Sequence, residues 1–252
     1  MSQPVLIVIP ARLAATRLPD KPLAMLGDAP MIVQVWRRAV EAGLGRVVVA
    51  AGDAAIADAV AAAGGEAVLT DPGLPSGTDR VHAAVRQLDP DRRYGIVVNL
   101  QGDLPALPPA TVAAVLEPLQ VLDTDIATLA VATLDERERA DPNVVKAIPA
   151  LPAGPGGAGG RLGRALYFTR ATAPWGEGPV WHHVGIYAYR RSALERFVRL
   201  PPSPLERREK LEQLRALEHG LSIGIACIDA VPAGVDTPED LARMRALFSP
   251  HS

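Results

Sequence analysis

Three short runs of mainly apolar, β-branched residues constrain the fold more than any other feature of the sequence. The runs are Val5 to Ile9, Val47 to Ala51 and Ile96 to Leu100. Continuous apolar runs of this length are typical of strands that are buried on both faces of a parallel sheet. The sequence therefore predicts an α/β fold in which helices cover both faces of the sheet.

Helical patterns lie between these strands. One is predicted over Pro30–Ala42, a second begins at Asp53, and others cover Asp79–Leu88 and Thr111–Leu119. The apolar stripe of the first helix consists of Ile32, Val35, Trp36, Ala39 and Val40. The alternation of strand and helix predicts right-handed crossovers in a doubly wound sheet, whose ligands bind beyond the carboxyl ends of the strands.

The second half of the chain has weaker signals. Val184–Tyr189 predicts a strand, Ser203 begins a predicted helix that ends at Glu218, and Thr237 begins the last helix. The Gly/Pro tract Leu151–Gly160 is too poor in side chains to pack, so we predict a flexible loop there.

Composition and charge exclude several classes of protein. The chain has 252 residues, of which 48% are hydrophobic and 21% charged, which suits one large or two small globular domains. Its net charge is −2, so it lacks the basic excess of a nucleic-acid-binding protein. Its single cysteine, Cys227, excludes an internal disulfide and is expected to be a buried thiol. We also expect neither an export signal nor a membrane span.

Charged residues gather where the predicted strands end. Arg12, Arg17 and Lys21 lie on a loop after the first strand, where they suit a polyphosphate, although charge alone favours a solvated loop. Asp103 follows the third strand and suits Mg²⁺ bound together with phosphates, or simply a turn. Asp236 precedes the last helix, as a second metal ligand or as its N-cap.

Eight segments extend this pattern over nearly the whole chain. They are Ile9–Arg12 with Arg17–Leu23, Ser76–Arg80, Gln101–Asp103, Ala165–Ala171, His183–Tyr187, Pro202–Glu206, Leu211–Leu214 and Gly234–Leu241. In this order they resemble the motifs of the sugar-acid cytidylyltransferases, most closely those of the members that act on 3-deoxy-manno-octulosonate.

The resemblance implies a fold and an activity. The fold is a Rossmann-like nucleotidyltransferase sheet formed by residues 1–125 and 226–252, with a smaller sugar-binding and dimerisation lobe at residues 126–225. The activity is Mg²⁺-dependent transfer of CMP from CTP to 3-deoxy-manno-octulosonate, which releases pyrophosphate and activates the sugar for lipopolysaccharide synthesis. A cytoplasmic homodimer is also implied.

The same resemblance implies roles for individual residues. Those expected around the nucleotide are Pro10, Ala11, Arg12, Lys21, Ser76, Gly77 and Arg80. Asp103 and Asp236 are the expected Mg²⁺ ligands, and with Arg12 and Lys21 they form the expected catalytic set. The residues expected to hold the sugar acid are Gln101, Arg170, His183, Tyr187, Glu212 and Gln213. Arg170 would pair with the sugar carboxylate through two parallel hydrogen bonds.

Other readings stay open at this level. Taken alone, His183 fits a partly buried structural histidine, Tyr187 a core aromatic, and Glu212 with Gln213 the solvent-facing side of a helix. The chain also departs from the family pattern, with Leu104 in place of an acidic residue and Ala51-Gly52-Asp53 in place of a Thr-Asp pair. The rival functions are a cytidylyltransferase for another acidic sugar, such as an 8-amino analogue or a sialic acid, and a non-catalytic CTP-binding protein.

Overall fold

The structure, a computed structural model, describes residues 3–14, 18–152 and 160–249. Arg17 and positions 153–159 of the Gly/Pro tract lie outside the described residues, so the predictions made for them stay predictions. The chain divides into two compact units, which are described separately. Unit 1 consists of Met1–Val112 and Pro232–Ser252, and unit 2 consists of Ala113–Val231.

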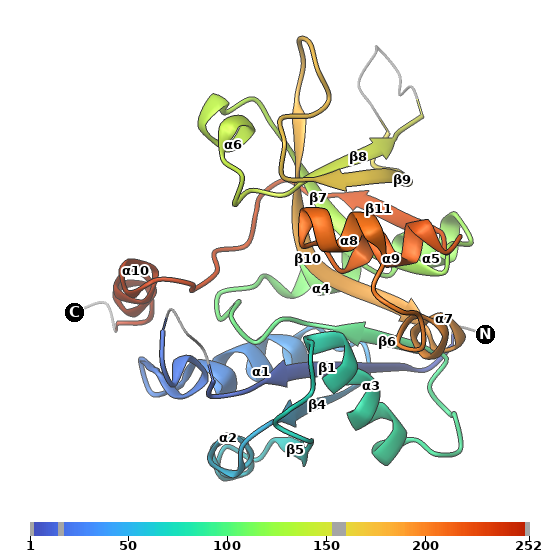
Figure 1. The fold of residues 1–252 in the computed structure, drawn as a ribbon. Coiled ribbons are helices and arrows are strands. Elements are labelled where there is room, and N and C mark those ends of the chain that lie inside the picture. The colour runs from blue at the N-terminus through green and yellow to red at the C-terminus, as the bar shows by residue number, and fades with distance from the viewer. Residues whose placement is uncertain (1–2, 15–17, 153–159, 250–252) are drawn as a thin grey trace. The chain divides into compact units, whose positions relative to one another are not determined.

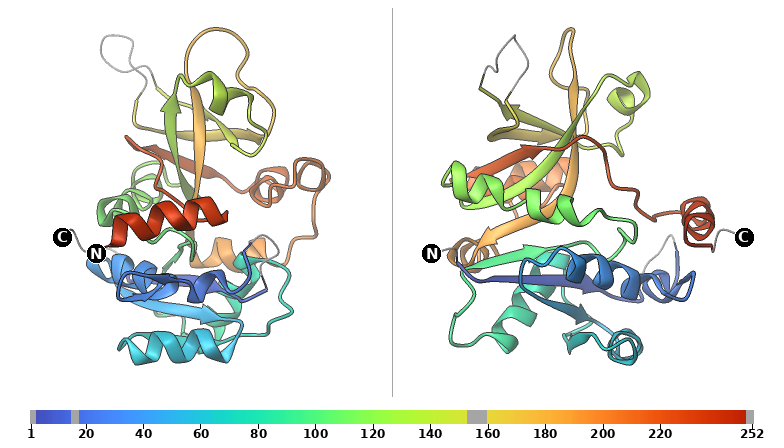
Figure 2. Two further views of the ribbon diagram at one scale, coloured as in Figure 1. Left: turned by 90° about the vertical axis from the view of Figure 1, so that its left-hand side faces the viewer. Right: turned by 180° about the vertical axis from the view of Figure 1, so that it is seen from behind.

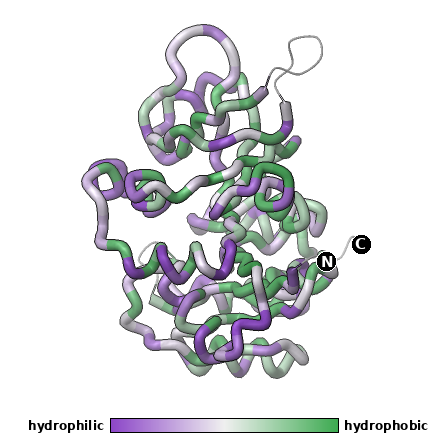
Figure 3. Tube along the Cα trace, turned by 90° about the vertical axis from the view of Figure 1, so that its right-hand side faces the viewer, coloured by the Kyte–Doolittle hydropathy of each residue, from purple (hydrophilic) through white to green (hydrophobic). Residues whose placement is uncertain are grey.

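Unit 1 is built on four parallel strands in the order β5-β4-β1-β6 (Figure 1). They are β1 (Val5–Ala11), β4 (Arg46–Ala51), β5 (Glu66–Leu69) and β6 (Ile96–Asn99). Three of them are the predicted apolar runs, and nearly all of their residues are buried. Figure 3 shows green, hydrophobic stretches of the trace separated by purple, hydrophilic ones. The predicted α/β fold is therefore confirmed.

The strand order reverses at β1, and this reversal positions the site. The connecting helices are α1 (Met31–Glu41), α2 (Ala54–Ala62) and α3 (Gly77–Leu88). Right-handed connections place α1 and α2 on one face of the sheet and α3 on the other. Accordingly, α3 lies in front of the sheet in Figure 1, and α1 lies in front of it in the right-hand view of Figure 2. The carboxyl ends of β1 and β6 thus form the topological switch point, where α/β sheets bind ligands.

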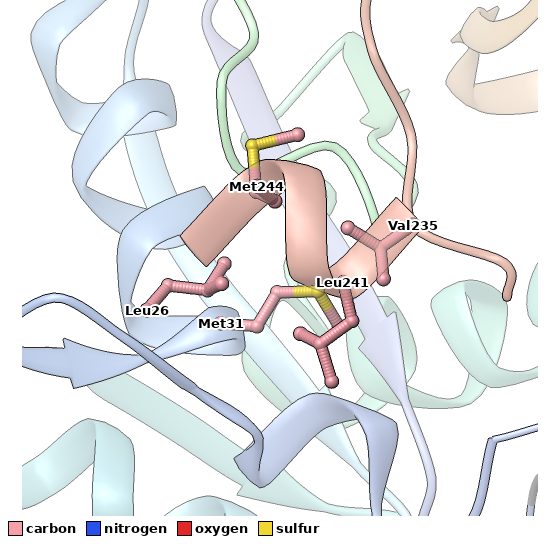
Figure 4. Close-up of a cluster of buried hydrophobic side chains, with 5 residues drawn as sticks. All are labelled: Leu26, Met31, Val235, Leu241 and Met244. Carbon is pink, nitrogen blue, oxygen red and sulfur yellow. The ribbon is translucent and has the colours of Figure 1, made fainter. Parts of the chain in front are cut away.

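The C-terminal helix α10 (Pro238–Phe248) packs in unit 1, against the hairpin of β2 (Met25–Leu26) and β3 (Ala29–Pro30). A buried cluster fixes this contact (Figure 4), and its members are Leu26, Met31, Val235, Leu241 and Met244. Val235 is fully buried, so the cluster also fixes the backbone beside Asp236.

Unit 2 contains a mixed sheet with the strand order β10-β7-β11-β9-β8, and a further pairing of β10 with β8 completes a closed circuit. Its strands are β7 (Ile126–Thr133), β8 (Lys146–Ala150), β9 (Leu162–Thr169), β10 (Val180–Arg190) and β11 (Ile223–Cys227). Only β7 and β11 pair in parallel among these strands. The predicted strand Val184–Tyr189 lies within β10.

The remaining helices are short. They are α4 (Pro109–Ala114), α5 (Glu117–Val121), α6 (Glu136–Ala140), α7 (Arg191–Phe197), α8 (Pro204–Glu209) and α9 (Gln213–Glu218). Among the described residues, no helix has the length and apolar composition needed to cross a membrane.

Two predicted helices are wrong in extent because each is broken. The helix over Thr111–Leu119 becomes α4 and α5, since Pro118 has no N–H to donate to Ala114, the last residue of α4. The helix from Ser203 to Glu218 becomes α8 and α9. It breaks at Lys210, whose φ of 57° is left-handed.

Two further expectations about burial need correction. Val40 is 47% exposed, because the buried face of α1 is shifted toward Met31 and includes Gln34. Gln34 is tolerated there because its amide donates to the Leu26 carbonyl at 2.8 Å. Cys227, expected to be buried, is half-buried.

Candidate active site

The loops that follow β1 and β6 form a cavity of about 370 Å³ in unit 1. Its lining residues are Pro10, Ala11, Arg12, Ala14, Leu18, Lys21, Pro22, Gln101, Gly102, Asp103 and Asp236. A cavity of this size suits a small-molecule ligand. The cavity brings together the predicted catalytic set from three separate segments of the chain. This set consists of Arg12, Lys21, Asp103 and Asp236.

A smaller cavity of about 130 Å³ shares Pro10, Ala11, Arg12 and Gln101 with the first. Ser76, Gly77 and Arg80, at the beginning of α3, also line it. Ser76 is the N-cap of this helix, and its hydroxyl accepts a hydrogen bond from Asp79 N at 3.1 Å. All residues expected around the nucleotide therefore line one or both of two adjoining cavities.

The Lys21 ammonium is bound by three oxygens from distant parts of unit 1. Nζ lies 2.9 Å from Asp103 Oδ2, 2.7 Å from the Val235 carbonyl and 3.2 Å from Asp236 Oδ1. An ammonium has three N–H donors, and these three acceptors match them in number. Lys21 therefore holds the two candidate metal ligands together in the structure.

Capping of α10 falls to Thr237 rather than to Asp236. Thr237 Oγ1 accepts from Asp240 N at 3.1 Å, and Asp240 Oδ2 accepts from the N–H groups of Asp236 and Thr237. This reciprocal capping box leaves the Asp236 carboxylate outside the cap. The backbone of Val235 is fixed as well, since its N–H donates to the Asp103 carbonyl at 3.0 Å.

The donor set near Lys21 fits a divalent cation. Magnesium prefers hard oxygen ligands, and proteins usually bind it through one or two carboxylates together with substrate phosphates. Asp103 and Asp236 supply two carboxylates, side by side and partly exposed. No cluster of three or more His, Cys, Asp or Glu side chains occurs in the described part of the chain, so the other ligands would come from phosphate and water.

Two arginines beside the cavities differ in their environment. Arg12 is exposed and makes no hydrogen bond with any residue that the structure describes. Arg80 is 2% exposed and donates to Thr70 Oγ1 and to the Asp71 and Pro72 carbonyls, so it anchors the loop after β5. Burial lowers the pKa of Arg80, and the charge of Arg12 lowers it further.

Asp53 stabilises the loop that follows β1 in a way that the sequence did not predict. It begins α2 as expected, but its Oδ2 accepts from Leu13 N at 2.8 Å instead of capping the helix. The next residue back, Gly52, is tightly enclosed, because a Cβ there would lie 2.9 Å from Arg80 Nη1 and 3.1 Å from Arg12 Cβ. The Ala51-Gly52-Asp53 departure thus shapes the backbone beside Arg12.

In unit 2, His183 and Tyr187 lie together on β10. Their ring centroids are 5.6 Å apart, and Phe168 contacts the His183 ring edge-on at 4.9 Å. Burial lowers the pKa of His183 to about 3 and raises the pKa of Tyr187 well above its usual value. Both side chains are therefore neutral near pH 7. A neutral His183 can accept a hydrogen bond at one ring nitrogen, and a neutral Tyr187 can donate one through its hydroxyl.

Arg170 is held by backbone carbonyls. Its Nε donates to the Glu209 carbonyl and its Nη1 to the Pro142 carbonyl, both at 2.9 Å, while Glu209 Oε2 accepts from Arg170 N. The Nε–H already donates to the Glu209 carbonyl, so a carboxylate cannot pair with that side of the guanidinium. At the Nη1–Nη2 end, N–H groups remain that make no hydrogen bond with the residues that the structure describes. The Glu209 carbonyl belongs to the last residue of α8, so Arg170 satisfies one of the carbonyls that a helix end leaves without an intrahelical partner.

The other predicted sugar-side residues fall in both units. Gln213 is 8% exposed at the start of α9, so its reading as a solvent-facing residue is wrong. Glu212 precedes it and is half-buried. Gln101 belongs to unit 1, where it lines both cavities. The sugar-binding role of these residues stays a prediction.

These features define a nucleotide-binding α/β enzyme of the nucleotidyltransferase type, and comparison with known proteins narrows the class. The cytidylyltransferase family model matches residues 6–223. The chain is 64% identical over 247 residues to the 3-deoxy-manno-octulosonate cytidylyltransferase of Rhodospirillum centenum, covering 98% of this chain and 94% of that protein. It is 61% identical to the protein of the same name from Parvibaculum lavamentivorans, covering 98% and 93% of the two chains.

Solved structures agree with this result. The structure of CMP:2-keto-3-deoxy-manno-octonic acid synthetase complexed with CTP matches with a TM-score of 0.88 and 37% identity, covering 98% of both chains. A nucleotidyl transferase from Methanothermobacter, at 15% identity and a TM-score of 0.64, shares the fold. The chain belongs to the cytidylyltransferase family.

If Asp103 and Asp236 bind a divalent cation, Lys21 would compete with it for the same oxygens, which predicts the behaviour of a Lys21→Met variant. Met matches the apolar stem of lysine and removes the charged ammonium, so Asp103 and Asp236 face each other without a cation. Binding of Mg²⁺ alone should become about three- to tenfold tighter, since partly exposed ion pairs contribute about 0.2–1 kcal/mol each. Titration calorimetry measures this affinity.

Arg38→Met is the matched control, because it removes one positive charge from a surface pair with Glu41 on α1. Its Mg²⁺ affinity should equal that of the unchanged chain. Equal affinities for Lys21→Met and Arg38→Met would contradict competition between Lys21 and the metal.

Proposed function

We propose that the chain transfers CMP from CTP to the anomeric hydroxyl of 3-deoxy-manno-octulosonate and so activates this sugar for lipopolysaccharide synthesis. One observation carries the proposal: two carboxylates and a lysine converge beside an exposed arginine, in a chain 64% identical to a cytidylyltransferase for this sugar. The hydroxyl oxygen loses its proton to the solvent and attacks the α-phosphorus. The bond from the α-phosphorus to the oxygen that bridges it to the β-phosphorus breaks, and pyrophosphate leaves with that oxygen. No covalent enzyme intermediate is required.

The nucleotide binds in the two adjoining cavities of unit 1. The backbone of Pro10 and Ala11 and the start of α3 at Ser76 and Gly77 contact CTP. Arg12 binds the triphosphate, for which its exposed guanidinium offers paired donors. Arg80 acts through the loop that it anchors, since its own N–H groups donate to that loop.

Asp103 and Asp236 hold Mg²⁺, which supplies positive charge to the phosphate oxygens in the transition state. Lys21 then leaves the two carboxylates and binds the phosphates. Its flexible stem allows this exchange, and its ammonium stabilises the negative charge that develops on the leaving pyrophosphate. Arg12, Lys21, Asp103 and Asp236 form the catalytic set.

The sugar acid binds to Gln101, Arg170, His183, Tyr187, Glu212 and Gln213. Arg170 pairs with the sugar carboxylate through its Nη1–Nη2 end. His183 and Tyr187 bind hydroxyl groups, since both side chains are neutral. Fixed polar groups of this kind orient the attacking hydroxyl toward the α-phosphorus.

The enzyme is a cytoplasmic homodimer. Its single cysteine and its CTP substrate support a cytoplasmic location. Unit 2 exposes large apolar side chains, namely Leu134, Leu166 and Trp175 at 71%, 62% and 98%, and burial against a second copy would remove them from water. Light scattering at micromolar concentration should give twice the chain mass of 26.5 kDa, and a monomer would contradict the dimer.

Pyrophosphate release with CTP, Mg²⁺ and a panel of sugar acids tests the function. Release should be fastest with 3-deoxy-manno-octulosonate and absent without sugar. Faster release with an 8-amino analogue or a sialic acid would identify that sugar as the substrate in place of 3-deoxy-manno-octulosonate. No release with any sugar would favour a non-catalytic CTP-binding protein. Asp103→Asn should reduce the rate by orders of magnitude, whereas Asp58→Asn, an exposed charge on α2, should leave it unchanged.

Arg170→Lys tests the division between sugar and nucleotide residues. Lysine keeps the charge but loses the paired donors, so the KM for the sugar should rise about ten- to a hundredfold while the KM for CTP stays unchanged. Crossed titration of both substrates measures this. Arg164→Lys is the control, because Arg164 is exposed on β9, the strand that ends just before Arg170. Equal changes in both KM values would contradict the assignment, and an unchanged sugar KM would leave Arg170 a structural residue.

A further inference from the structure

An irregularity in the pairing of β7 with β10 brings His183 and Tyr187 together. Val184 pairs with Leu129, but the next β7 residue, Thr128, pairs with Tyr187, so Gly185 and Ile186 are extra. Four residues of regular strand span about 13 Å. The His183 and Tyr187 ring centroids, by contrast, are 5.6 Å apart. The bulge thus gathers two polar rings that a regular strand would separate.

Thr128 lies at the centre of this bulge. Its side chain is fully buried, and its Oγ1 has three close neighbours. They are the Ile186 carbonyl at 2.9 Å, the Val184 carbonyl at 3.1 Å and His183 Nε2 at 3.0 Å. One carbonyl belongs to Val184, the last residue paired before the bulge, and the other to Ile186, one of the two extra residues. The Thr128 hydroxyl can therefore supply a donor to the backbone at the bulge.

The number of protons in this cluster decides the tautomer of His183. A threonine hydroxyl has one proton to donate, and a carbonyl oxygen can only accept. If His183 Nε2 accepted that proton, both carbonyl oxygens would face a hydroxyl oxygen at about 3 Å with no proton between them. Donation from Thr128 to a carbonyl requires that His183 Nε2 carry the ring proton and donate it to Oγ1.

We propose that Thr128 is a positioning residue that holds His183 in the Nε2–H tautomer, so that Nδ1 accepts a hydrogen bond from a hydroxyl of the sugar substrate. The sugar part of this proposal rests on the proposed function. His183 Nδ1 makes no hydrogen bond with the residues that the structure describes, and Phe168 fixes the plane of the ring. The low pKa of His183, a result of burial, keeps Nδ1 unprotonated at neutral pH.

The proposal gives His183 a defined chemical preference. An unprotonated Nδ1 repels a carboxylate and accepts from a hydroxyl. The anionic group of the sugar therefore belongs elsewhere, and a substrate analogue that lacks the hydroxyl facing His183 loses one hydrogen bond. Thr128 enforces this selection without touching the substrate.

Nitrogen-15 NMR of the substrate-free protein tests the tautomer directly. Two-bond proton–nitrogen correlations of labelled histidine should show His183 protonated at Nε2 in the unchanged chain and in Thr128→Ser. Thr128→Val, which removes the hydroxyl at nearly constant volume, should shift the population toward the Nδ1–H form. An Nδ1–H tautomer in the unchanged chain would overturn the proposal, and this result needs neither a variant nor a substrate.

Kinetics of the same variants separate a positioning role from a structural one. Thr128→Val should raise the KM for the sugar about three- to tenfold and leave the KM for CTP unchanged, whereas Thr128→Ser should restore the sugar KM. Thr124→Val is the matched control, since Thr124 is also fully buried in unit 2 and its hydroxyl donates to the Pro118 carbonyl. Equal sugar KM values for both valine variants would overturn the positioning role.

The two measurements also separate this proposal from the proposed function. If the unchanged chain releases no pyrophosphate with any sugar, the proposed function fails, and the tautomer measured by NMR still decides the role of Thr128. If pyrophosphate is released but the tautomer is Nδ1–H, only the role of Thr128 fails.

Discussion

The interaction of the Lys21 ammonium with Asp103, Val235 and Asp236 is the contact on which the candidate site depends. It joins the loop after β1, the loop after β6 and the segment before α10, which are separated by 82 to 215 residues in the chain. Because the Asp103 and Asp236 carboxylates both contact Lys21 Nζ, their negative charges would repel each other without a cation between them. In the present structure Lys21 supplies that positive charge, and in the proposed mechanism a metal ion would take its place when the substrate binds.

Much of the fold could be predicted from the sequence because its signals are local. The strands β1, β4 and β6 follow from continuous apolar runs, and the helix α1 follows from its apolar periodicity. The reversal of strand order at β1 then places the charged loops at one edge of the sheet. Asp103 and the Lys21 loop are therefore identifiable as candidates from the sequence alone.

What could not be predicted depends on tertiary contacts. Lys210 adopts a left-handed conformation next to Glu209, whose carbonyl accepts a hydrogen bond from Arg170, and no local pattern reveals that contact. Asp53 looks like an ordinary N-cap, yet its carboxylate binds Leu13 N, forty residues away in the chain. Thr128 looks like a typical β-strand residue, because its function follows from a bulge in the partner strand. Sequence analysis could name the candidate site residues, whose roles stay predictions, but it could not reveal the tertiary contacts that hold them.

The most direct test of the central claim is a pair of crystal structures, one of the free enzyme and one with CTP and Mg²⁺. In the free enzyme, Lys21 Nζ should lie within hydrogen-bonding distance of both Asp103 and Asp236, as in the present structure. In the complex, Mg²⁺ should contact both carboxylates, and Lys21 Nζ should bind a phosphate oxygen of CTP. A complex in which Lys21 keeps both carboxylates and the metal binds elsewhere would contradict the account.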